Sequence, residues 1–216
     1  MPLYTAEALV LRTYKLGEAD KIVVFLTRDR GKKRGVAKGA RRPRSSFTGA
    51  LEPMTEVRVA YFEKERRELV GLNYAETYRS PLTLGNPDAL GYIGYFAELL
   101  DEWAQESDAD DRLYRLGASM LDALSTGAPV EPLARYFEYW LLRLQGVYPE
   151  SQAGLSAGAV AFLAESRTVR PQQVGSVRVE PRALRELENV HRTLISMHLE
   201  KTLKSDRVLR DLRRHA

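Results

Sequence analysis

The sequence of 216 residues contains no cysteine. This absence excludes disulfide bonds, thiolate metal sites and cysteine nucleophiles, and it is consistent with a cytoplasmic protein. Histidine is almost as scarce, with only His191, His198 and His215. The first two lie two helical turns apart and cannot chelate one metal ion without further ligands. We therefore expect no metal site and no cofactor, and we interpret the histidines as core-edge or partner-facing residues.

Long apolar runs are also missing. No stretch approaches the roughly 20 apolar residues that a membrane span needs. The first residues, 1–7, lack the basic and apolar regions of a signal peptide. Glycines at 31, 35 and 39 are spaced differently from those of a P-loop, so a nucleotide site is not predicted. No pattern typical of a catalytic triad or a zinc protease occurs, and we expect a protein that is not an enzyme.

Charge is distributed unevenly along the chain. The formal net charge of +4 hides a net +7 in residues 1–80, a net −8 in residues 81–150 and a net +5 in residues 151–216. Such a partition indicates one surface that binds a polyanion and a body of different charge. The run Asp108 to Asp111 resembles a metal-binding acidic cluster, but we interpret it as the N-cap of a helix.

The densest positive charge lies in residues 28–44, which hold nine Lys or Arg and one acid, Asp29. So many like charges cannot be buried unpaired, because each buried ion would cost several kcal/mol. They must face water or a polyanion. The apolar run 22–26 directly before them indicates that the charge is carried on a strand pair. This pattern predicts a nucleic-acid-binding surface on a small β-barrel.

The first 80 residues read as five short strands, at 8–13, 22–27, 33–38, 57–62 and 68–75. Five strands in so short a segment favour a closed barrel, because closure removes exposed strand edges. In the third strand, Arg34, Val36 and Lys38 share one side, and Gly35 and Ala37 share the other. The small residues would let the strand curve tightly or let another backbone approach.

The pattern changes to helical spacing after residue 80. Asn86 and Pro87 begin the first predicted helix, and Asp110 or Asp111 caps the second, which Gly127 ends. A third helix begins at Pro132 and ends at Gly146. Ser156 begins a short fourth helix, and Pro181 begins a long fifth one after a link at 170–180. A break at 204–205 precedes a last basic helix. We thus predict an α+β protein with a domain at 1–80 and an all-α domain at 81–216.

Single-stranded nucleic acid also needs aromatic faces on which bases stack. The candidates in the predicted barrel are Tyr14, Phe47, Tyr61, Phe62 and Tyr74. For each ring, packing inside the barrel is the alternative, and for the charges the alternative is a solvated face. The aromatic residues 136–140 are interpreted mainly as core, with a groove for a partner peptide as the alternative.

Several ordered segments resemble the RecO family of recombination mediators. They are Val10–Arg12, Gly17–Lys21, Phe25–Thr27, Gly31–Lys32, Ala37–Arg42, Ser45–Phe47, Leu51–Pro53, Tyr95–Leu99, His198–Leu199 and Leu203–Arg207. The resemblance is dense through residue 53 and sparse between 105 and 180. Many members carry a four-cysteine zinc module after the third helix of the second domain. Here residues 146–155 form a short link without cysteine, so we expect no zinc.

The resemblance implies an N-terminal OB-fold barrel followed by a helical domain. It implies binding of single- and double-stranded DNA, annealing of complementary strands, and loading of recombinase onto coated strands in the RecF pathway. It also implies two partners, RecR and the C-terminal tail of the single-strand-binding protein, and a cytoplasmic, nucleoid-associated location. The pocket for that tail cannot be assigned to residues of this chain.

We therefore predict a DNA-binding mediator of repair and recombination. The predicted DNA-binding residues are Lys32, Lys33, Arg34, Lys38, Arg41, Arg42 and Arg44, with Arg12, Lys21, Arg28 and Phe47 as weaker candidates. One alternative is an OB-fold RNA-binding protein of translation or RNA processing, which would prefer strands with a 2′-hydroxyl. Another is a scaffold whose basic face binds an acidic protein.

Overall fold

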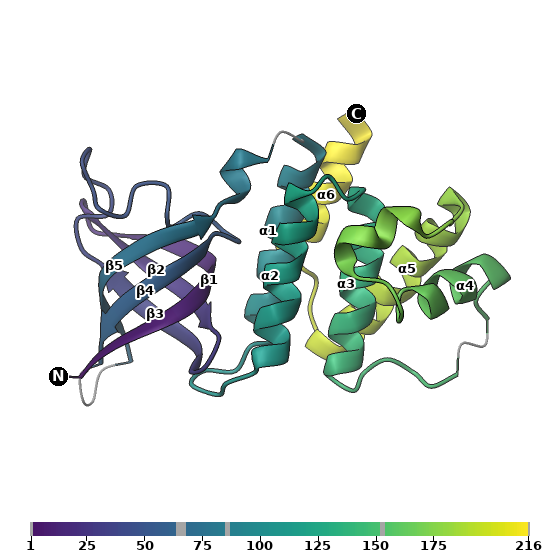
Figure 1. Cartoon of the computed structure of the whole chain (residues 1–216), viewed down its shortest axis with the longest axis horizontal. Coiled ribbons are helices and arrows are strands. Elements are labelled where there is room, and N and C mark those ends of the chain that lie inside the picture. Colours follow the sequence, from purple (N-terminus) through teal and green to yellow (C-terminus); the bar gives the residue numbers. More distant parts are fainter. Residues whose placement is uncertain (1, 64–67, 85–86, 152–153, 216) are drawn as a thin grey trace. The chain divides into compact units, whose positions relative to one another are not determined.

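The computed structural model describes residues 2–63, 68–84, 87–151 and 154–215, without the side chains of 87–88 and 210–215. The chain divides into two compact units, one of residues 1–85 and 93–121 and one of residues 86–92 and 122–216. Strands come first along the chain and helices follow (Figure 1). The predicted α+β class is confirmed. The domain boundary after residue 80 stays a prediction, because the first unit also contains helical residues.

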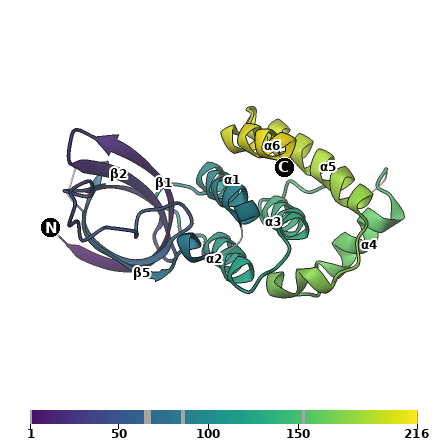
Figure 2. The same ribbon diagram turned by 90° about the horizontal axis from the view of Figure 1, so that it is seen from above.

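The strands of the first unit form a closed barrel with the order β1-β2-β3-β5-β4. Their bounds are β1 (Leu3–Leu16), β2 (Asp20–Thr27), β3 (Gly31–Ala37), β4 (Glu56–Phe62) and β5 (Val70–Arg79). β3 and β5 pair in parallel, and the other neighbours pair antiparallel. Figure 2 looks into the ring that the strands form. The five predicted strands and the barrel are confirmed, with ends that differ by a few residues.

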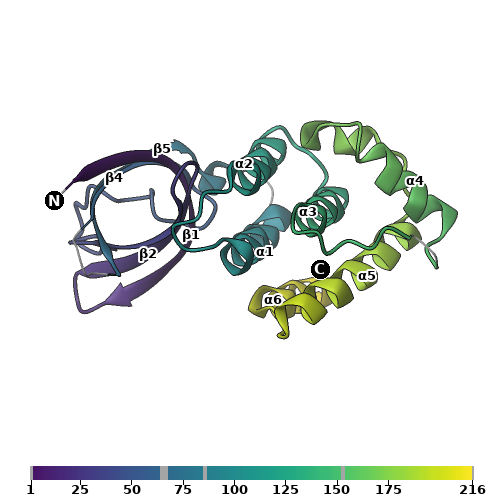
Figure 3. The same cartoon turned by 90° about the horizontal axis from the view of Figure 1, so that it is seen from below.

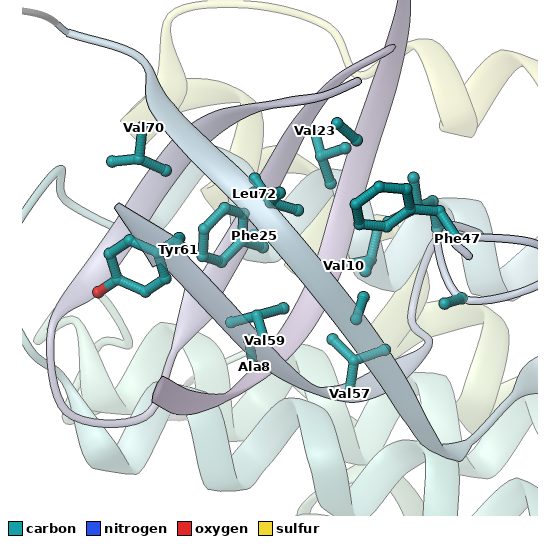
Figure 4. Close-up of a cluster of buried hydrophobic side chains, with 14 of the residues drawn as sticks. Ala8, Val10, Val23, Phe25, Phe47, Val57, Val59, Tyr61, Val70 and Leu72 are labelled. Atoms are coloured by element: carbon teal, nitrogen blue, oxygen red, sulfur yellow. The ribbon is translucent and has the colours of Figure 1, made fainter. Parts of the chain in front are cut away.

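The barrel interior is filled by one side of each strand, as the alternation predicts. Figure 4 shows Val23, Phe25, Val59 and Tyr61 pointing inward among the strands, and all four are buried. In β3, Gly35 and Ala37 face this core. A Cβ on Gly35 would lie 2.0 Å from Leu72 Cδ1, so the small residue allows β5 to approach, as expected. Burial raises the pKa of Tyr61 to about 12, because the ionised phenol would lose its hydration.

Two helices lie beside the outer face of β1 in the same unit, as Figures 1 and 2 both show. They are the part of α1 (Pro87–Trp103) from residue 93 and α2 (Asp111–Ser125) up to residue 121. A Cβ on Gly117 would lie 2.7 Å from Leu9 Cδ1, so the glycine permits close packing on the barrel. The Asp110 carboxylate accepts hydrogen bonds from the N–H groups of residues 112 and 113, which confirms the predicted N-cap of α2.

The second unit is helical, and its elements are best followed in Figure 3. It contains α3 (Val130–Leu144), α4 (Ala157–Glu165), α5 (Pro181–Leu199) and α6 (Lys204–His215), and α5 packs on both α3 and α4. The short 3-10 helices η1 (Pro81–Thr83) and η2 (Pro171–Ser176) complete the described elements.

Helix boundaries differ from the predictions at a few places. α3 begins at Val130, before the predicted Pro132, since proline is tolerated in the first turn, where N–H groups have no helical partner. The link at 170–180 contains η2, and the last break lies at 200–203 instead of 204–205. Ser156 caps α4 as predicted. The predicted cap Asn86 lies outside the described residues.

The turn between β2 and β3 touches the α1–α2 connection at Gly31. Lys32 N–H donates to the Gln105 carbonyl at 3.0 Å, and Ser107 N–H donates to the Lys32 carbonyl at 3.1 Å. Gly31 has φ of +67°, and a Cβ there would lie 2.4 Å from the Asp108 backbone. Only glycine satisfies both the backbone conformation and the close approach.

We expect Gly31→Ala to destabilise the protein by about 2–4 kcal/mol, from left-handed backbone strain plus overpacking. The measurement is chemical denaturation of both proteins. Gly17→Ala is the matched control, because Gly17 has φ of +56° with nothing within 4 Å of the added Cβ. It should cost only the strain, about 1–2 kcal/mol. Equal losses in the two variants would contradict the close approach to Asp108.

Candidate nucleic-acid interface on the barrel

The three predicted cations of β3 are already paired with carboxylates. Lys32 Nζ lies 3.3 Å from Asp101 Oδ1, and Lys33 Nζ lies 2.8 Å from Glu63 Oε1. These lysine side chains are only 15% and 14% exposed. Arg34 Nε lies 2.8 Å from Glu106 Oε1. The positive charge of this strand is therefore largely neutralised within the first unit.

Two of the weaker candidates are paired as well. Arg12 forms an ion pair with Asp101, which is 5% exposed. Arg28 donates to Glu7 at 3.0 Å and to Asp111 at 2.9 Å, and these hydrogen bonds raise the pKa of its guanidinium. The pairs of Arg28 are exposed to solvent and contribute little to the stability of the fold, so their main effect is to position the side chain.

We call Arg12, Arg28, Lys32, Lys33 and Arg34 the paired cations. Their acids lie in β1, after β4, and in residues 101–111, which include the end of α1, the connection to α2 and the first residue of α2. The sequence predicted Lys32, Lys33 and Arg34 as DNA-binding residues together with the cations that follow β3, and Arg12 and Arg28 as weaker candidates. The structure does not bring them together in that way, because each already has a carboxylate within ion-pair distance. We leave them out of the interface proposed below.

The cations that follow β3 have a different environment. We call residues 38–44 the cation loop, after its exposed side chains Lys38, Arg41, Arg42 and Arg44. None of the four forms an ion pair with a carboxylate of the residues that the structure describes. Four uncompensated positive charges within seven residues produce a strongly positive potential at this end of the barrel.

Backbone contacts hold the cation loop against the β1–β2 hairpin. Arg41 N–H donates to the Ala19 carbonyl at 2.9 Å, and the Arg41 guanidinium donates to the Gly17 carbonyl at 2.9 Å. Gly39 has φ of +68°, and its N–H donates to Asp20 Oδ1 at 2.8 Å. The loop is thus fixed by groups that leave the charges of Lys38, Arg42 and Arg44 free to face solvent.

Phe47 lies in the barrel core, just after the cation loop in the sequence. The sequence offered it as a weaker DNA contact, but its ring is 5% exposed and belongs to the barrel core together with Ala50 and Leu51 (Figure 4). A base cannot stack on a ring that is buried in this way, so that prediction is wrong. Tyr61, another stacking candidate, is fully buried, so packing in the core, which the sequence also offered for each ring, is the reading that holds for it. Phe47 instead anchors the chain just after the cation loop.

One cation was missed by sequence reasoning. In the register of the hairpin, Lys15 lies opposite Lys21, and neither has an ion-pair partner among the described residues. Like charges directly opposite each other are destabilising unless an anion lies between them. Both lysines flank the turn 17–19 that holds Arg41. Lys15 and Lys21 are each two positions from an end of this turn. That symmetric spacing is the sequence signal that could have shown that they lie opposite each other.

The remaining stacking candidates lie on the outside of the barrel. Tyr14 is 44% exposed, Tyr74 is 37% exposed, and Phe62 is half-buried. Tyr78, which the sequence reasoning did not select, is 48% exposed and lies under the Arg58 guanidinium at 5.4 Å. The barrel therefore offers aromatic faces to solvent, although only some of them are the predicted ones.

Among the described residues, the histidine and acidic side chains are the ones that a metal ion could use as ligands. His191 is fully buried, with Nδ1 2.9 Å from Glu138 Oε2 and Nε2 3.3 Å from the Tyr148 hydroxyl. His191 is therefore a core residue, which is closer to the predicted core-edge position than to the partner-facing alternative. Within the described residues no three His, Asp or Glu side chains gather as a metal site would require. In that same part of the chain, no helix is long and apolar enough to cross a bilayer.

Family comparisons match the two parts of the chain in order. The model described as Recombination protein O N terminal matches residues 1–81, and the model described as Recombination protein O C terminal matches residues 84–165. The first therefore covers the barrel with its cation loop.

Individual relatives agree with these matches. A protein named DNA repair protein RecO from Koribacter versatilis is 42% identical over 150 residues, which are 68% of this chain and 61% of the relative. Its namesake from Anaeromyxobacter sp. (strain K) is 37% identical over 70% of this chain and 60% of the relative. The one from Symbiobacterium thermophilum is 35% identical over 84% of this chain and 68% of the relative. The chain thus spans about three fifths of the length of the first two relatives.

Proposed function

Because the chain belongs to the recombination protein O family of DNA repair proteins, we propose that it is a DNA-binding recombination mediator that anneals complementary single strands. We further propose that it acts without catalysis of its own, and that it helps load recombinase onto coated single-stranded DNA together with RecR. The tail of the single-strand-binding protein is the second proposed partner. The relatives named above are all described as DNA repair proteins, so nothing favours the RNA-processing alternative.

The observation that supports DNA binding most strongly is the set of uncompensated cations at one end of the barrel. Lys15, Lys21 and the cation loop carry six positive charges without an ion-pair partner among the described residues. A polyanion is the ligand that such a cluster attracts, since each phosphate it neutralises releases condensed counterions.

The proposed mechanism of annealing is electrostatic. Two single strands repel each other through their phosphates, and a cationic surface that binds both backbones removes part of that repulsion. Bases that remain free can then test each other for pairing. Contacts to phosphates carry no sequence information, so the same surface serves any pair of complementary strands.

The test is an annealing assay with two complementary labelled oligonucleotides that are coated with single-strand-binding protein. We expect the protein to accelerate duplex formation, and strands of unrelated sequence to give no signal. Unchanged annealing of complementary coated strands at saturating protein would contradict the proposal. Recombinase filament formation on the coated strand, with and without RecR, tests the loading step separately.

A further inference from the structure

A row of apolar residues crosses the outer face of the barrel beside the cation loop. The register places Tyr14 opposite Ile22, Ile22 opposite Val36, and Val36 opposite Gly71. Residues that are directly opposite across strands share one face of the sheet. Val23 and Ala37 face the core, so their neighbours Ile22 and Val36 face outward (Figure 4 shows Val23). We call Tyr14, Ile22, Val36 and Gly71 the apolar strip.

The apolar strip is partly open to solvent. Tyr14 is 44% exposed, and Ile22 and Val36 are half-buried. Gly71 has nothing within 4 Å of an added Cβ, and the register continues from it to Phe62, which is half-buried. In the adjacent row, Val24 is only 3% exposed. An apolar row left in water on an outer sheet face marks a binding surface more often than a neutral one.

The charges on the two sides of the strip are unequal. On one side the neighbouring row contains Arg12 and Arg34, which belong to the paired cations. On the other side Lys38 continues β3 into the cation loop, whose side chains have no described carboxylate partner. A ligand lying across this surface meets uncompensated positive charge along one edge only.

The Tyr14 ring contacts the Arg12 guanidinium, which limits its orientations. The Arg12 guanidinium lies 5.3 Å from the ring centroid, and Arg12 is itself tied to the buried carboxylate of Asp101. A ring that is already ordered loses little conformational entropy when a second planar group stacks on it. This arrangement is suited to a planar ligand group.

A ligand with phosphates along one edge and flat apolar rings along the other is a single strand of nucleic acid. In a duplex the base faces are stacked inside and cannot reach the barrel. Resting on the DNA binding proposed above, we propose that the apolar strip, with Tyr14 as its stacking ring, contacts unpaired bases and gives this surface its preference for single strands over duplex. The positive charge of the cation loop favours a single strand, which carries phosphates, over an uncharged apolar partner.

The test compares three probes of equal length, an oligothymidylate, an abasic oligonucleotide with the same number of phosphates, and a duplex. We expect the wild-type protein to bind the oligothymidylate about 5- to 150-fold more tightly than the abasic strand, as one stacked base provides. Tyr14→Ala should remove most of this ratio, leave abasic and duplex binding unchanged and keep the same salt dependence. Tyr14→Phe should retain the ratio.

Tyr78→Ala is the matched control, because Tyr78 is equally exposed on the barrel and also lies beside an arginine. It should leave all three affinities unchanged. If Tyr14→Ala unfolds, Tyr14→Leu keeps an apolar side chain without a planar ring and takes its place. Equal wild-type affinity for the oligothymidylate and the abasic strand, or an unchanged ratio in Tyr14→Ala or in its substitute Tyr14→Leu, overturns the strip proposal while leaving phosphate binding intact. Failure of the wild-type protein to bind any probe overturns the proposed function itself.

Discussion

Replacing Arg41, Arg42 and Arg44 by alanine is expected to weaken binding of a single-stranded oligonucleotide roughly 100-fold at about 0.1 M salt. The slope of log K against log salt concentration should fall by about 2, since each lost phosphate contact removes about 0.7. The physical reason is that these arginines are exposed and have no carboxylate of the described residues to neutralise them. Fluorescence anisotropy at several salt concentrations measures both quantities.

The matched control removes the same number of charges from the paired cations, as Arg28→Ala, Lys33→Ala and Arg34→Ala. Each of these residues has a carboxylate within 3.0 Å, so DNA must first displace an internal anion to reach it. We expect the salt slope of this variant to stay close to that of the wild type. An equal fall in both triple variants would show that the internal ion pairs open on DNA and that the interface includes β3.

Glu138→Gln is expected to destabilise the second unit by about 3–5 kcal/mol, the usual result of removing one partner of a buried ion pair. Glu138 Oε1 lies 2.8 Å from the Arg135 guanidinium, and the two side chains are 2% and 4% exposed. The second carboxylate oxygen accepts from His191 at 2.9 Å if that ring nitrogen carries the proton. The variant leaves the buried arginine with one carboxylate fewer. Urea unfolding followed by tryptophan fluorescence measures the loss.

Two further variants sharpen this prediction. Arg192→Ala removes a partly exposed guanidinium that pairs with Glu188 at 2.8 Å and with Asp206 at 3.5 Å, and it should cost only about 0–1 kcal/mol for each pair. Combining Arg135→Met with Glu138→Leu should recover most of the loss, because an apolar pair of similar size needs no charge partner. If Glu138→Gln costs no more than Arg192→Ala, the buried network is not a determinant of stability.

Much of the fold could be predicted because it depends on local patterns. Alternation in β3 gave the correct inward and outward sides, and the cap at Asp110 and the proline at the start of α5 gave helix starts. These signals act within a few residues. The start of α3 was missed because proline in a first turn does not mark the first helical residue.

The site could be predicted only in part, because pairing of charges is a long-range property. Lys32 and Asp101 are 69 positions apart, and Arg12 and Asp101 are 89 apart. Composition showed a basic first segment and an acidic middle segment, but not that acids of the second would neutralise cations of the first. Phe47 was misjudged for a related reason, since an aromatic residue in a loop can fold back into a core.

The anchoring of the cation loop affects how fast DNA strands bind and leave in the proposed annealing reaction. Because backbone bonds at Gly39 and Arg41 order the loop in the free protein, no folding step has to precede encounter with DNA. Arrival of a strand is then limited by diffusion and electrostatic steering. In the proposed function, salt favours the departure of a strand, because it screens the contacts between the loop and the phosphates. One ordered loop would then serve successive pairs of strands without refolding between them.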